Sequence, residues 1–366
     1  MFKLALSALI SLLFAMTPAE AAKVEQRGST ASVKKQVVKK KSAAKKKPRY
    51  KRREAAAKRV TVTTRGKAVR RVIMVRGKRK VVYQRLTSAP VIRAMTAGDK
   101  AGLNLTRDPL DLKSSVALVL DQTNSEVLFE KNAGVALPIA SITKLMTGLI
   151  VVEAQQDMDE VLTVTDDDVD REKFTSSRLR VGSRLTRREM LHIALMSSEN
   201  RAAAALGRNY PGGILAFVDA MNAKAKELKL TATHFVDSSG LAPGNVSSPA
   251  DLGKLVAAAS RYEIISEYST TGEVNVQLPD SKRKLSFVNT NALVRASDWK
   301  IGLSKTGYIS EAGKCLVMQA IIANQPVVIV LLDSWGRLTR IGDANRIRKW
   351  LEKNPGKLAT SPLRSG

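Results

Sequence analysis

Three short polar motifs contain the residues of this sequence best suited to nucleophilic chemistry: Ser141-Ile-Thr-Lys144, Ser198-Glu-Asn200 and Lys305-Thr-Gly307. The chain has only two histidines, neither in a recognisable partner motif, so a Ser-His-Asp triad is not expected. If a serine is the nucleophile, another side chain must accept its proton. A lysine with a lowered pKa can do so.

Ser141 and Lys144 have the spacing that makes two side chains neighbours on a helix surface. The apolar residues around them predict a helix over 138–154, with a core stripe of Ile142, Leu145, Met146 and Leu149. Burial beside this stripe would lower the pKa of the lysine, because desolvation disfavours the ammonium form. Of five Ser-x-x-Lys sequences in the chain, only this one opens a long apolar helix.

The other two motifs are the only Ser-x-Asn and the only Lys-Thr-Gly sequences in the chain. The first follows an apolar helical run and the second ends a strand-like run, so both stand where an element could present them to a cleft. Each alone is equally consistent with a polar turn or an ordinary strand end. Their order along the chain is the more specific signal.

The elements that must position these motifs form an α+β pattern. Strand-like runs lie near both ends of the globular part, at 115–121, 126–132, 299–307, 314–322 and 326–333. The middle of the chain is mostly helical, with a capping box at Thr186 and a cap at Ser248 followed by Pro249. This order predicts one antiparallel sheet made from both chain ends and flanked by helices, with an inserted helical lobe.

The first 21 residues have the pattern of an export signal. Lys3 precedes an apolar run over 4–16, and Ala19-Glu-Ala21 fits a small-x-small cleavage site. This apolar run is too short to span a bilayer. We therefore expect a signal peptide over 1–21 and an exported, periplasmic protein, with a retained signal anchor as the alternative.

Residues 22–104 form a basic, low-complexity extension. The segment 23–93 contains 26 Lys and Arg residues against Glu25 and Glu54, whereas the rest of the chain is near charge balance. We expect it to be largely disordered, with β-prone runs between 60 and 84. It is either a solvated tether or an attachment to an anionic wall or membrane surface, which would make the protein peripherally associated. Export and few aromatic residues argue against nucleic acid.

The sequence indicates no metal site and no cofactor. Cys315 is the only cysteine and lies in an apolar strand-like run, so it is expected to be a small core residue. His192 and His234 have structural interpretations. No cluster of Cys and His has the spacing of a zinc site.

The three motifs together resemble the signature of class A β-lactamases and penicillin-binding proteins. The stretches "ALMSSENRAAAAL", "YPGG" and "FVDSSGLAPGNVSSPADL" also resemble the low-molecular-mass D-Ala-D-Ala peptidases, and the D-alanyl-D-alanine endopeptidase subgroup most. The resemblance implies a β-lactamase/transpeptidase-like fold. It also implies a DD-peptidase domain over 105–354, followed by a tail over 355–366.

For catalysis, the resemblance implies that Ser141 is the nucleophile that becomes the acyl-ester and that Lys144 is its base. Ser198 would relay a proton toward the leaving amine. The backbone N–H groups of Ser141 and Tyr308 would form the oxyanion hole.

For substrate binding, the resemblance implies that Asn200 hydrogen-bonds the substrate and Lys144. Lys305 would attract the substrate carboxylate, and Thr306 would hydrogen-bond the same end. Gly307 would leave the strand edge free of a side chain where the substrate backbone docks.

The expected function is therefore a serine DD-peptidase that hydrolyses peptidoglycan stem peptides, is inhibited by β-lactams and acts in cell-wall remodelling. A class A-like β-lactamase is the alternative. It needs a carboxylate that primes the deacylating water, and Glu172 is the only nearby candidate, in no matching motif. A third interpretation is a non-enzymatic wall-binding scaffold, against which the three intact motifs argue.

Overall fold

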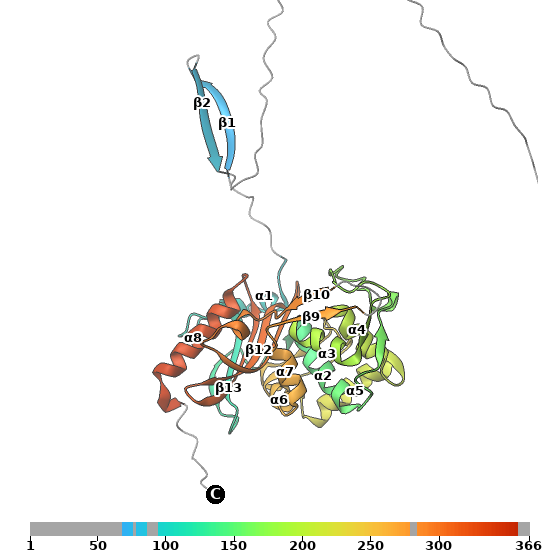
Figure 1. Cartoon of the computed structure of the whole chain (residues 1–366). Coiled ribbons are helices and arrows are strands. Elements are labelled where there is room, and N and C mark those ends of the chain that lie inside the picture. The colour runs from blue at the N-terminus through green and yellow to red at the C-terminus, as the bar shows by residue number, and fades with distance from the viewer. Residues whose placement is uncertain (1–67, 76–77, 86–93, 279–283, 358–366) are drawn as a thin grey trace, which may run out of the picture. The chain divides into compact units, whose positions relative to one another are not determined.

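The computed structural model describes four stretches of the chain, residues 68–75, 78–85, 94–278 and 284–357 (Figure 1). The chain divides into two compact units, Met1–Ser88 and Ala89–Gly366. In the first unit, β1 (Ala68–Val75) pairs antiparallel with β2 (Lys78–Arg85). The β-prone runs over 70–75 and 80–84 thus lie in a hairpin. The predicted signal peptide, the Lys-rich residues 22–67 and the tail from 358 lie outside the described residues.

The second unit is built on a five-stranded antiparallel sheet of order β11-β12-β13-β3-β4. Its strands come from both ends of the unit: β3 (Ser114–Asp121), β4 (Val127–Lys131), β11 (Lys300–Ile309), β12 (Gly313–Ile322) and β13 (Gln325–Ser334). Figure 1 shows α8 (Thr339–Lys353) on one side of this sheet and the other long helices on the opposite side. The predicted fold class is confirmed.

The helical lobe is inserted between β4 and β11. Its helices are α2 (Lys144–Glu153), α3 (Arg187–Met196), α4 (Asn200–Arg208), α5 (Gly213–Glu227), α6 (Pro249–Ala259) and α7 (Glu263–Thr270). The capping box at Thr186 and the Ser248 cap with Pro249 begin α3 and α6 as predicted. Within the described ranges, no helix is both long and apolar enough to cross a bilayer.

Shorter elements complete the second unit. Three two-stranded pairs are β5 (Leu137–Pro138) with β8 (Val246–Ser247), β6 (Val161–Thr163) with β7 (Arg184–Thr186), and β9 (Glu273–Gln277) with β10 (Lys284–Val288). Single helical turns are α1 (Ala97–Lys100), η1 (Leu103–Leu105), η2 (Ala140–Thr143), η3 (Asp166–Asp168), η4 (Ala292–Arg295) and η5 (Pro355–Lys357).

The central sheet has an apolar core on each face, because alternate residues of a strand point to opposite sides. In β3, Val116 and Leu118 belong to the core under the helical lobe. Ala117 and Val119 belong to the core under α8. The near-continuous burial of β3 therefore reflects a strand covered on both faces. The sheet packed in this way also contains β11, the strand that carries the Lys-Thr-Gly motif.

The described part of the second unit includes residues before 105. Thr96 is buried and forms a capping box with Asp99 at the start of α1. The Ala97 N–H donates to the carbonyl of Glu311 at 2.8 Å, which joins α1 to the end of β11. A single turn of this kind has no long periodic pattern by which it could be recognised in the sequence.

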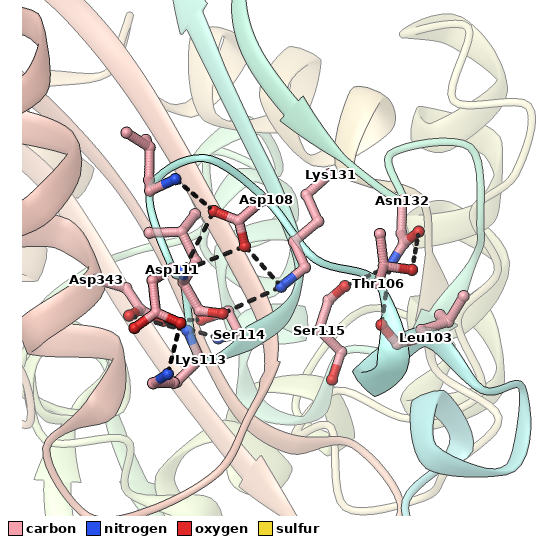
Figure 2. A network of polar contacts seen from close by, with 12 residues as sticks. Leu103, Thr106, Asp108, Asp111, Lys113, Ser114, Ser115, Lys131, Asn132 and Asp343 are labelled. Atoms are coloured by element: carbon pink, nitrogen blue, oxygen red, sulfur yellow. Dashed lines mark hydrogen bonds and ion pairs between the residues drawn. The ribbon is translucent and has the colours of Figure 1, made fainter.

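A buried ion pair fixes the chain just before β3 (Figure 2). Lys131 Nζ lies 3.0 Å from a carboxylate oxygen of Asp108, and both side chains are at most 5% exposed. Asp108 also accepts from the N–H groups of Leu110 and Leu112, and Lys131 donates to the carbonyl of Leu112. The two charges are thus compensated by each other and by backbone dipoles.

We expect Lys131→Ala to lower the free energy of unfolding by about 3–5 kcal/mol, because it leaves the Asp108 carboxylate buried without its cation. Urea unfolding followed by circular dichroism would measure the change. Lys113→Ala is the matched control: Lys113 pairs with Asp111 at the surface and should matter far less, since exposed pairs are screened by water. Equal effects of the two substitutions would contradict a stabilising buried pair.

Candidate active site

The sequence predicts Ser141 and Lys144 on one continuous helix. In the structure Ser141 lies instead on the 3₁₀ turn η2, which precedes α2. Ala140 has a positive φ of 48°, which an α-helix cannot accommodate. The backbone of residues 139–141 is also approached closely by two glycines, and a side chain at either glycine would collide with it. A Cβ at Gly240 would lie 2.1 Å from the Ala140 carbonyl oxygen, and one at Gly307 would lie 2.8 Å from the Ile139 carbonyl oxygen.

The predicted pair nevertheless meets. Lys144 Nζ lies 2.9 Å from Ser141 Oγ, and Lys144 is completely buried. The same nitrogen donates to Asn200 Oδ1 at 2.7 Å and to the Ser239 carbonyl at 2.6 Å. A neutral primary amine has two hydrogens and one lone pair. The two carbonyl-type acceptors take both hydrogens, and the lone pair is left for the hydroxyl of Ser141.

Burial lowers the pKa of Lys144 to about 7, against the opposing effect of the negative charges of Asp237 and Glu199. No carboxylate among the described residues forms an ion pair with this ammonium. Near neutral pH a large share of the amine is therefore unprotonated and able to accept a proton from the serine.

The loop that supplies the Ser239 carbonyl was not assigned a role from the sequence. The Asp237 carboxylate accepts from the N–H groups of Ser239, Gly240 and Ala242 and from the side chain of Asn245. These bonds fold the loop tightly against Ser141. The recognisable signal was an Asp followed by two Ser and a Gly, which is typical of a side-chain-stabilised turn.

The Ser-x-Asn motif lies between α3 and α4. Asn200 reaches the site directly, and its side-chain N–H donates to Thr175 at 3.0 Å, which fixes the orientation of the amide. The buried Glu199 accepts from Ser177. Ser198 has a positive φ of 63°, a conformation rare for serine and often found at functional sites. Among the described residues, no hydrogen bond joins the Ser198 hydroxyl to Ser141 or Lys144.

Lys305 is buried on β11 and donates to the carbonyl of Thr306. Burial and the positive charges of Lys144 and Arg340 hold the pKa of Lys305 well below its usual range. Arg340, near the start of α8, was not singled out in the sequence. Burial lowers the pKa of its guanidinium, and its Nε has no hydrogen-bond partner. A carboxylate beside these two basic side chains would favour the charged form of Lys305.

Thr306, Gly307 and Tyr308 follow Lys305 on β11, which is an edge strand of the sheet. Thr306 donates to the hydroxyl of Thr290 at 2.6 Å. The position that a Cβ of Gly307 would take lies 3.1 Å from the backbone nitrogen of Ser141, so the two backbones are adjacent only because residue 307 is glycine. Tyr308 is 59% exposed. An extended peptide can add to such an edge as a further strand.

Three other residues considered in the sequence lie apart from this chemistry. Cys315 is fully buried in the core, and burial raises the pKa of its thiol to about 12. His192 stacks on Tyr268 and contacts the hydroxyl of Thr271. His234 pairs through its backbone with Val246. No group of His, Cys, Asp and Glu with metal-binding geometry occurs in the part of the chain that the structure describes.

Comparisons with known proteins indicate the family of this chain. A family model described as D-alanyl-D-alanine carboxypeptidase matches residues 104–335. The D-alanyl-D-alanine endopeptidase of Pseudomonas aeruginosa is 47% identical over 69% of this chain and 81% of its own length. The D-alanyl-D-alanine endopeptidase of Escherichia coli is 42% identical over 72% of this chain and 84% of its own length.

Solved structures show the same fold. The Streptomyces K15 DD-transpeptidase matches with a TM-score of 0.62 at 26% identity, over 67% of this chain and 98% of that one. A D-alanyl-D-alanine carboxypeptidase from Mycobacterium tuberculosis has a TM-score of 0.61 over 70% of this chain and 95% of its own. At 24% identity this second match supports the fold alone.

We expect the rate at which Ser141 reacts with a labelled penicillin to rise with pH through about 7 and then to level off. The pKa of Lys144 is lowered to about 7, so below that pH the amine is protonated and cannot accept the serine proton. Stopped-flow measurement across neutral pH would give the profile, with circular dichroism as a control for folding at each pH. A rate that is constant through pH 7 would contradict the assignment of Lys144 as the base.

Proposed function

The chain belongs to peptidase family S11, the D-alanyl-D-alanine carboxypeptidases, and we propose that Ser141 and Lys144 perform the chemistry of that family in it. The resemblance predicted from the three motifs is confirmed. The protein is a serine-type DD-peptidase, a hydrolase of D-Ala-containing peptides of the cell wall. The contacts of Lys144 with Ser141, Asn200 and Ser239 are the observation that carries the proposed roles.

In the acylation step, neutral Lys144 takes the proton of Ser141 Oγ while Oγ attacks the carbonyl carbon of the substrate. The N–H groups of Ser141 and Tyr308 stabilise the oxyanion, and loss of one such donor typically costs about 3 to 4 kcal/mol. When the peptide C–N bond breaks, Lys144 returns the proton to the leaving amine, directly or through Ser198. Water then attacks the ester carbonyl and gives a proton to the Lys144 amine. Lys144 passes this proton to Ser141 Oγ as the bond between Oγ and the acyl carbon breaks, which releases the acid product and restores the serine.

The substrate peptide lies along β11 in this proposal. Its carboxylate approaches Lys305 and Arg340, whose charges otherwise repel each other, and Thr306 hydrogen-bonds the same end. Asn200 is held where its amide can face both Lys144 and the peptide. Gly307 lets the peptide carbonyl approach the Ser141 backbone.

We infer that bonds between cross-linked stem peptides are the preferred substrates. The two endopeptidases compared above are matched over 81% and 84% of their own lengths, so the similarity covers most of each protein. β-Lactams are expected to acylate Ser141, because their reactive carbonyl would enter the same site.

A class A-like β-lactamase is not favoured. Glu172, its proposed deacylating carboxylate, is exposed in a loop that lines a cavity of about 490 Å³ beside Asn200. Among the described residues, no hydrogen bond or ion pair joins the Glu172 carboxylate to Ser141 or Lys144. The curated proteins compared above are peptidases.

Ser141→Ala should reduce hydrolysis of cross-linked muropeptides by roughly 10⁴-fold or more, because no acyl-ester can form. Mass spectrometry of the released fragments would measure hydrolysis, and labelled penicillin would report acylation. Ser297→Ala is a matched control, since Ser297 also precedes a lysine by three residues but is exposed and outside the site. It should retain both activities. Rapid turnover of penicillin by the unaltered protein would favour the β-lactamase instead.

We further propose that residues 1–21 direct export and that the mature enzyme acts in the periplasm, in cell-wall remodelling and the control of cell shape. The export pattern of the first residues supports this, as does the substrate, which lies outside the cytoplasm. In this proposal the basic extension holds the enzyme against an anionic wall or membrane surface. Each Lys or Arg near an acidic membrane contributes roughly 1 kcal/mol to such binding.

Removal of residues 23–88 should abolish binding of the mature protein to vesicles that contain phosphatidylglycerol, because most of the excess positive charge lies there. Sedimentation at low and high salt would measure binding, which should weaken with salt in the intact protein. Acylation by penicillin should be unchanged, because the second unit begins at Ala89. Salt-independent binding, or binding that survives the truncation, would refute electrostatic attachment.

A further inference from the structure

Two cavities at one end of the central sheet are both lined by Trp335. One, of about 420 Å³, begins at Tyr308 on β11. The other, of about 660 Å³, is lined by residues 104–108 and 111–115, which lead into β3. Neither cavity is lined by the catalytic pair, so the proposed reaction does not account for them. The two cavities together are called the Trp335 groove below.

The first cavity of the groove is aromatic. The side chains of Tyr308 and Trp335 are 59% and 58% exposed, although rings of this size are usually covered. Lys314 Nζ lies 4.2 Å from the centre of the Tyr308 ring and helps to hold it in place. Arg337 lines the same cavity. A flat apolar surface therefore stands beside cationic hydrogen-bond donors.

The second cavity is polar. Asn104, Arg107 and Asp111 are exposed along it and offer both donors and acceptors. Its wall is held by the buried pair of Asp108 and Lys131, which Figure 2 shows beside the chain that enters β3. Because this wall is already ordered, a ligand would not have to order it on binding.

We propose that the Trp335 groove binds the glycan strand of peptidoglycan, beside the stem peptide that lies along β11. The inference rests on the proposed function, because a stem peptide of the wall reaches the enzyme covalently attached to its glycan. Sugar rings have apolar faces that stack on aromatic side chains and hydroxyl edges that hydrogen-bond to amide, carboxylate and guanidinium groups. The groove offers both kinds of surface, and it begins at Tyr308, one residue after Gly307, so a glycan attached to the bound peptide is within reach.

The test compares two cross-linked substrates, a muropeptide dimer that carries its disaccharides and the same peptide dimer with the sugars removed. Trp335→Ala should raise KM for the sugar-bearing dimer about tenfold, the usual effect of one lost stacking contact, with little change in kcat. KM for the sugar-free dimer should not change. Trp335→Phe keeps a ring and should recover most of the difference.

Leu215→Ala is the matched control, because Leu215 is a 79% exposed apolar side chain on α5 that does not line the groove. It should leave both KM values unchanged. An equal effect of Trp335→Ala on the two dimers would overturn the glycan assignment and indicate a contact with peptide, and no effect on either would overturn it as well. Acylation by labelled penicillin distinguishes failure of the glycan proposal from failure of the proposed function. If the unaltered protein is not acylated, the proposed function is refuted.

A direct binding measurement completes the test. Peptide-free glycan oligomers of alternating N-acetylglucosamine and N-acetylmuramic acid, which the enzyme cannot hydrolyse, should change the tryptophan fluorescence of the unaltered protein in a saturable way. This change in fluorescence should be lost in Trp335→Phe, because Trp335 is the tryptophan that lines the groove. Absence of a saturable signal in the unaltered protein, together with no effect of the oligomers on hydrolysis of the sugar-bearing dimer, would refute glycan binding.

Discussion

A primary amine that is buried away from water is unstable as an ammonium ion unless an anion lies against it. Lys144 is in that position, because its nitrogen contacts the amide oxygen of Asn200, the carbonyl of Ser239 and the hydroxyl of Ser141. It forms no ion pair with a carboxylate in the part of the chain that the structure describes. Burial therefore lowers its pKa to about 7. The 3₁₀ turn, the folded loop at Ser239 and the helices around α2 all serve to keep this nitrogen dry and in contact with one hydroxyl.

The same constraint connects the base to substrate binding. Lys305 is buried near Lys144 and Arg340, so its ammonium is also disfavoured unless an anion lies beside it. A substrate carboxylate would offset the repulsion among these cations and favour the charged form of Lys305. In the proposed function, the anionic end of the substrate would therefore stabilise the charged form of the lysine that binds it.

The sequence allowed the main elements to be predicted because their signals are local. The capping box at Thr186 and the continuous apolar run of β3 need only neighbouring residues to be recognised. The contacts of Ser239 and the place of Arg340 depend instead on segments far apart in the chain, and a backbone carbonyl that orients a base leaves no residue-type signal. Ala140 explains why the predicted helix over 138–154 begins only at Lys144, since its positive φ interrupts the helical backbone before that residue.

Two buried lysines of the second unit show how the hydrogen-bond partner of a lysine decides whether its charged form is favoured. Lys131 lies against the Asp108 carboxylate, an arrangement that keeps a charged pair in place and fixes the chain before β3. Lys144 has Asn200 in the corresponding role, and the amide oxygen accepts the same kind of hydrogen bond without a negative charge. An Asp at position 200 would preserve the geometry but favour the ammonium, which cannot accept the serine proton. The amide is therefore what suits Lys144 to the proposed role of a base, whereas the carboxylate suits Lys131 to that of a structural cation.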